Sequence, residues 1–103
     1  MLERDYQKTL IAKLERLFPG CFILKNDPGY LQGVPDLLIL HGDRWAMLEV
    51  KAKANAATQP NQAYYVDLLS RMSFAAFIDP SNEQDVLDAL SRAFHGVALP
   101  SEA

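Results

Sequence analysis

The sequence lacks the features that mark several protein classes. It has one cysteine among 103 residues, so no disulfide can form within the chain and a reducing, cytoplasmic compartment is expected. Its net charge is −3, whereas proteins that coat nucleic acid nonspecifically carry a strong basic excess. No apolar run approaches the ~20 residues that span a bilayer. The charged start MLERDYQKTL does not resemble a signal peptide. We therefore expect a soluble protein without a membrane partner.

Half of the residues are hydrophobic, which is enough for a modest core. We expect one domain over residues 1–96 and a loose tail over residues 97–103. Periodicity and turn residues predict helices over residues 3–18, from Thr58 to about Met72, and from Ser81 to Phe94. They predict strands over residues 21–26, 34–40, 44–52 and 74–79. This order predicts an α/β fold in which helices flank a central mixed β-sheet and the last two strands are parallel.

The second and third expected strands lie in GVPDLLILHGDRWAMLEVKAK, from Gly33 to Lys53. Gly42 and Asp43 suit the two-residue loop of a hairpin, because glycine fits the first position of a type I′ or II′ turn. That loop sets a register in which Asp36 faces Glu49. Directly opposed side chains have Cβ atoms about 4.5–5.5 Å apart.

Two carboxylates at this separation repel unless a cation lies between them. Their apolar neighbours, Leu37–Leu40 and Met47–Val50, predict strands buried on both faces, where charge is costly. Lys51 shares the face of Glu49, but Mg²⁺ or Mn²⁺ suits paired carboxylates better than one flexible ammonium. The alternative is a solvated face on an edge strand.

The residues Gly33-Val34-Pro35-Asp36, followed by Glu49-Val50-Lys51 and Gln62, resemble the signature of the VRR-NUC family. This family belongs to the PD-(D/E)XK nuclease superfamily. The resemblance implies a restriction-endonuclease-like αβββαβ core with an extra C-terminal helix. It also implies metal-dependent cleavage of DNA, including structured or branched DNA, by a homodimer in the cytoplasm of a bacterial or phage-infected cell.

The resemblance also implies roles for individual residues. Asp36, Glu49 and the carbonyl of Val50 would hold Mg²⁺ or Mn²⁺. Lys51 would position the attacking water. Gln62, which shares a helix face with Val66 and Leu69, would support Lys51 or that water. Glu3, in the first helix, would act through a metal-bound water; the alternative is a solvent-exposed carboxylate at a helix N-terminus.

Four further residues are candidates for contact with nucleic acid. Lys53, Arg4 and Lys8 would contact phosphates, although solvated side chains are the alternative for all three. Tyr30 would stack on a base, or pack within its loop. His41 and His95 have no metal-ligand spacing and are expected at the surface.

Two other function classes compete with an active nuclease. One is a nuclease-fold DNA-binding or inhibitory module that has lost catalysis, and the other is a structural subunit of a phage assembly. Because a decayed site often loses its lysine or one carboxylate, the presence of Asp36, Glu49 and Lys51 together favours an active enzyme.

Overall fold

A computed structural model describes residues 1–97, and their helices and strands follow one another in the expected order. The elements are α1 (Glu3–Leu17), β1 (Phe22–Lys25), β2 (Leu37–His41), β3 (Arg44–Val50), α2 (Pro60–Ser70), β4 (Phe74–Ile78) and α3 (Glu83–Ala93). Within the described residues, no helix is long and apolar enough to cross a membrane.

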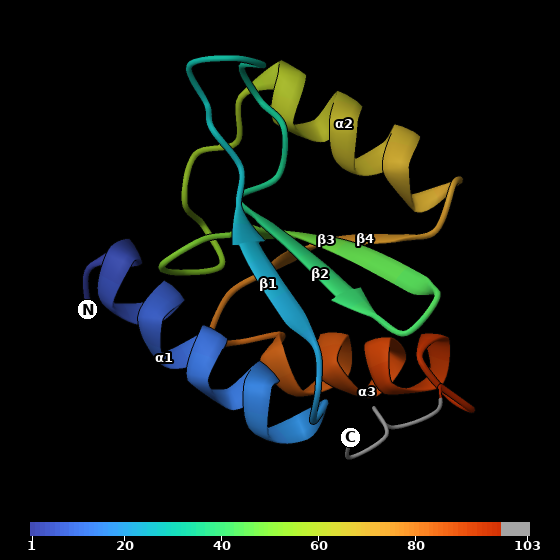
Figure 1. Cartoon of the computed structure of the whole chain (residues 1–103). Coiled ribbons are helices and arrows are strands. Elements are labelled where there is room, and N and C mark those ends of the chain that lie inside the picture. The colour runs from blue at the N-terminus through green and yellow to red at the C-terminus, as the bar shows by residue number, and fades with distance from the viewer. Residues whose placement is uncertain (98–103) are drawn as a thin grey trace.

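The strands form one mixed sheet in the order β1-β2-β3-β4. The β1–β2 and β2–β3 pairs are antiparallel, whereas β3 and β4 are parallel. The expected α/β class and the expected parallel pair are therefore confirmed. Helix α2 lies on one face of the sheet, and α1 and α3 lie on the other (Figure 1).

The core lies between the sheet and the pair α1 and α3. Tyr6, Leu10 and Leu14 form the buried stripe of α1. Leu17, the last residue of α1, is 47% exposed, and Phe18, the next residue, is buried. The remaining buried apolar residues are Leu37, Ile39, Ala46, Leu48, Val50, Ile78, Leu87, Leu90 and Phe94.

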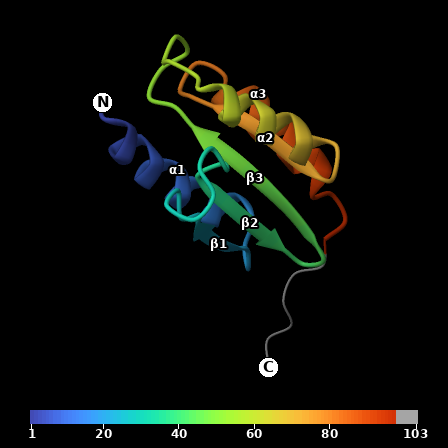
Figure 2. The same ribbon diagram turned by 90° about the horizontal axis from the view of Figure 1, so that it is seen from above.

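The opposite face of the sheet is only partly covered, so the expectation of burial on both faces is wrong for β2, whereas the successive residues Leu48, Glu49 and Val50 of β3 are all buried. Helix α2 contacts β3 and β4. In the view from above it lies near these two strands and away from β1 (Figure 2). Beyond its reach, Phe22, Leu24 and Leu40 are 62%, 42% and 38% exposed. One side of the sheet is thus a core, and the other is open over β1 and β2.

Two helix starts differ from expectation. Helix α2 begins at Pro60 with Gln59 as its N-cap, one residue later than an N-cap at Thr58 would place it. Helix α3 begins after Asn82, because the Ser81 hydroxyl donates to the Asp79 carboxylate and does not cap the helix.

His41, which was expected at the surface, is buried. Its ring lies 5.7 Å from that of Phe18 and 5.3 Å from that of Phe94, between centroids. Val97, the first residue of the expected tail, packs against the core. The rest of that tail, residues 98–103, lies outside the described residues.

Candidate active site

The hairpin of β2 and β3 has the register that its turn predicted. Leu40 pairs with Trp45 and Leu37 with Leu48, so the next position along places Asp36 opposite Glu49. Gly42 has φ +63°, and Asp43 has no positive φ, which selects the type II′ turn. At the other end of the hairpin, the Asp36 carboxylate Oδ2 accepts the Val50 N–H at 2.9 Å. This hydrogen bond therefore joins the two strands where the β2–β3 ladder ends.

Asp36 is fixed by a residue that the motif does not contain. The Asn26 N–H donates to the Asp36 carbonyl at 2.9 Å, and the Asn26 side-chain amide donates to the Pro35 carbonyl at 2.8 Å. Asn26 directly follows β1, where a polar residue closes the strand ladder. Its place after a short apolar strand was the only sequence signal for this role.

Glu49 is 3% exposed and lies on the face that α2 covers in part. Gln62, in the first turn of α2, donates from Nε2 to Glu49 Oε2 at 3.0 Å. The same amide accepts through Oε1 from Lys51 Nζ at 2.8 Å and from the Gln59 N–H at 3.0 Å. Because all three contacts orient one planar group, Gln62 links the carboxylate and the ammonium in a fixed geometry.

Lys51 completes this chain of contacts. Its side chain is 11% exposed, and its Nζ lies 3.7 Å from Glu49 Oε2. The ammonium also donates to the Ala57 carbonyl at 3.0 Å, in the segment between β3 and α2. The structure thus brings Asp36, Glu49, Lys51 and Gln62 together at one end of the sheet.

The charges at this site are unbalanced. Burial, together with the charge of the nearby Asp36 carboxyl and a hydrogen bond to it, raises the pKa of Glu49 from 4.5 to about 7. The Lys51 charge lowers this pKa, whereas that of Glu3 raises it. The carboxylates of Glu49, Asp36 and Glu3 thus face only one ammonium, that of Lys51. Such a site favours either a retained proton or an added cation.

Glu3 begins α1 and is exposed. It is near enough for its charge to act on Glu49, but residues 1–97 contain no group of three Asp, Glu, His or Cys side chains placed to hold a metal ion. Glu3 is therefore not placed with Asp36 and Glu49 as a third direct metal ligand.

The donor set that remains nevertheless suits a hard divalent cation. Asp36 and Glu49 offer carboxylate oxygens beside the last residue of β3, Val50, which is fully buried. Mg²⁺ usually binds through one or two carboxylates and keeps several waters. Two carboxylates with surplus negative charge match that requirement.

The four residues expected to contact nucleic acid are all exposed. Arg4, Lys8 and Lys53 are exposed, and their side chains form no ion pair with the rest of residues 1–97. Tyr30 is 89% exposed, which contradicts the alternative that it packs within its loop. These side chains are free to meet a ligand.

Comparison of this chain with models of protein families, with curated proteins and with solved structures gave no match.

Proposed function

We propose that this protein is a Mg²⁺- or Mn²⁺-dependent endonuclease that hydrolyses phosphodiester bonds in DNA, including structured or branched DNA. One observation carries the proposal: buried Glu49 faces Asp36, and Gln62 joins it to Lys51. The helix and strand order is also compatible with a restriction-endonuclease-like αβββαβ core followed by an extra helix.

Asp36, Glu49 and the carbonyl of Val50 would hold the metal ion. When bound, the cation would lower the pKa of water and withdraw electron density from the phosphate. The raised pKa of Glu49 supports this assignment, because buried carboxylates that repel each other gain most from an added positive charge.

Lys51 would place its ammonium where the attacking water and the developing phosphate charge need a donor. It is well suited to that role because contacts with Gln62 and Ala57 hold its flexible stem. Gln62 is a positioning residue, since its amide sets the separation between Lys51 and Glu49. Glu3 would act through a metal-bound water.

Arg4, Lys8, Lys53 and Tyr30 would contact the DNA outside the reacting centre. With a net charge of −3, binding by one chain should be weak and sensitive to salt. We therefore propose that the enzyme is a homodimer, which would combine two sets of basic side chains. The mass of the protein in solution tests this.

The direct test is DNA cleavage by the purified protein in Mg²⁺, Mn²⁺ or EDTA. Asp36→Asn and Lys51→Ala should abolish cleavage, whereas Asp43→Asn should not. Asp43 is the matched control because it is an exposed carboxylate at the far end of the same hairpin. Equal activity in all variants would mean that a contaminant cuts the DNA. DNA binding without cleavage would favour the inactive module.

A further inference from the structure

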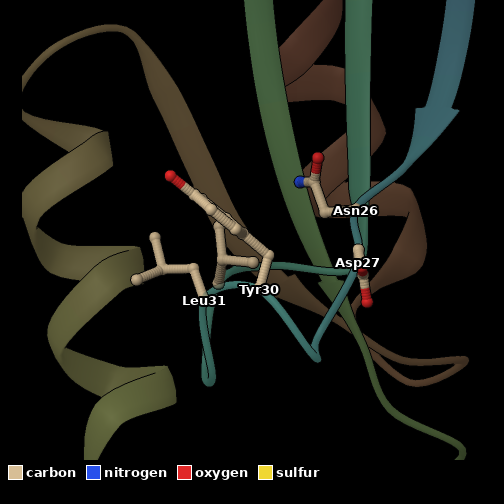
Figure 3. Close-up of a pocket in the computed structure, with 5 residues that line it drawn as sticks. Asn26, Asp27, Tyr30 and Leu31 are labelled. Carbon is tan, nitrogen blue, oxygen red and sulfur yellow. The ribbon is translucent and has the colours of Figure 1, made fainter.

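A hollow of about 330 Å³ lies beside the candidate site, in the loop that joins β1 to β2. Its lining residues are Asn26, Asp27, Tyr30, Leu31 and Val34. Tyr30 and Leu31 extend on the side of α2, and Asn26 and Asp27 lie on the side of the strands (Figure 3). The volume is within the range of about 300–1,000 Å³ that is typical of small-molecule sites.

The loop around this hollow is held in place by specific contacts. The Asp27 carboxylate accepts the Gly29 N–H at 2.8 Å, and the Asn61 side chain, in α2, donates to the Gln32 carbonyl at 3.0 Å. Gly33 has φ +94°, and a Cβ there would lie 2.6 Å from the Asn61 side chain. The loop therefore packs on α2 as closely as glycine permits, and Tyr30 projects from a fixed support.

The hollow and the candidate site share a wall. Asn26 lines the hollow and also bonds to the carbonyls of Pro35 and Asp36. A group bound in the hollow would thus lie next to the backbone that carries Asp36. Any DNA whose phosphate meets Asp36 and Glu49 would place a neighbouring nucleotide near this loop.

The chemistry of the hollow fits a nucleobase better than a phosphate. Asp27 would repel a phosphate, but its carboxylate and the Asn26 side-chain oxygen can accept hydrogen bonds from the amino and imino groups of a base. The Tyr30 ring, which is 89% exposed, offers a stacking surface. Leu31 and Val34 supply the apolar remainder of the lining.

We propose that this hollow binds one unpaired base of the DNA, beside the bond that is cut. A paired base hides its faces in the helical stack and its hydrogen-bonding edge in the pair, so only a base outside the duplex can enter. This inference rests on the proposed nuclease function and deepens it. The preferred substrate has an unpaired nucleotide next to the cleaved phosphodiester.

The test measures binding and cleavage separately. 2-Aminopurine is placed at successive unpaired positions of a branched DNA, and its fluorescence is followed in EDTA as wild-type protein is added. At one position, stacking on Tyr30 should quench the fluorescence. The same label within a duplex, and the free nucleoside, should show no quenching. Absence of quenching at every unpaired position overturns the proposal.

Tyr30→Ala should remove the quenching and weaken binding of the branched DNA about ten-fold, while Tyr30→Phe should retain both. Phe22→Ala is the matched control, because Phe22 is an exposed aromatic residue that pairs with Leu40, at the opposite end of the sheet. Equal losses in Tyr30→Ala and Phe22→Ala, or an equal effect on fully paired DNA, would contradict a base-binding role.

Cleavage in Mn²⁺ then distinguishes the two proposals. Tyr30→Ala should raise KM for DNA with an unpaired nucleotide and leave kcat nearly unchanged, because Tyr30 does not touch the reacting atoms. If wild-type protein shows Tyr30-dependent quenching but cuts no DNA, the base site stands and the nuclease function fails. If the protein cuts DNA but shows no quenching, the nuclease function stands and the base site fails.

Discussion

Glu49, which is buried, and Glu83, which is partly buried, have similar neighbours and opposite shifts of their pKa. Each lies near one lysine and one neutral donor. Glu83 forms an ion pair with Lys13 and accepts the Tyr6 hydroxyl at 2.9 Å. Burial alone would raise its pKa, but these hydrogen bonds outweigh burial and lower the pKa of Glu83 below its usual value. Burial and Asp36 instead raise that of Glu49 to about 7.

The difference follows from the balance of charge around each carboxylate. Glu83 has a cation in direct contact, and its bonds tie α1 to α3. Glu49 lies 3.7 Å from the Lys51 ammonium, which is also bound elsewhere, and it faces a second acid. The first carboxylate has a structural role that its partners satisfy. The second still lacks positive charge, which makes it the candidate metal ligand.

The largest expected effect separates the two glutamates by activity. Glu49→Gln should lower the rate of DNA cleavage about 10²–10³-fold, the usual range for loss of one group that stabilises transition-state charge. Glu83→Gln should leave cleavage by folded protein within about two-fold. Single-turnover kinetics in Mn²⁺ measures both rates. Comparable losses of cleavage rate in the two variants would contradict a catalytic role that belongs to Glu49 and not to Glu83.

Addition of metal ion should stabilise the protein through one of these sites only. At about 100 times its Kd, Mn²⁺ should raise the free energy of unfolding by about 2.7 kcal/mol. Asp36→Asn should remove most of this gain, and Glu83→Gln should keep it. Urea titrations at pH 8, with Mn²⁺ or EDTA, provide the measurement. Equal stabilisation of Asp36→Asn would place the ion elsewhere.

Loss of the Glu83 charge should destabilise the fold. Glu83→Gln should lower the free energy of unfolding by about 1–3 kcal/mol, because the bonds from Lys13 and Tyr6 are charge-assisted. In EDTA at pH 8, Glu49→Gln should instead leave stability unchanged or increase it, since it removes a charge that is buried unfavourably. The same urea titrations compare the variants, and a greater loss in Glu49→Gln would reverse the assignments.

The smallest expected effect is in the pH dependence of stability. The folded-state pKa of Glu49, about 7, exceeds its ordinary value of 4.5, so the folded protein binds the extra proton between these values. In EDTA, stability should therefore fall as pH rises from about 5 to about 8, by about 1–2 kcal/mol. Glu49→Gln should lack this decline. Glu83 acts in the opposite sense, because its lowered pKa contributes stability that is lost at acid pH.

The sequence predicted the geometry that local rules determine. A two-residue turn with Gly42 in its first position determines the hairpin register, and the register places Asp36 opposite Glu49. Likewise, apolar periodicity predicted helices where α1 and α3 lie. These features depend on residues that are close in sequence, so the sequence of one segment is enough to predict them.

The support around the site could not be predicted in the same way. Asn26 joins the two ends of the loop before Asp36, and Asn61 anchors that loop from α2. The link from Tyr6 to Glu83 spans most of the chain. Burial of β2 was overestimated because an apolar run does not show how far a helix such as α2 extends across the sheet. Long-range packing, more than local preference, decided these features.

The central claim is that Asp36 and Glu49 hold a divalent cation, and Mn²⁺ diffraction tests it most directly. A crystal of the protein soaked in Mn²⁺ should show an anomalous difference peak between the two carboxylates, next to the Val50 carbonyl. The peak should be absent in Asp36→Asn. No peak at this position, in a soak at a Mn²⁺ concentration that supports cleavage in solution, would contradict the account.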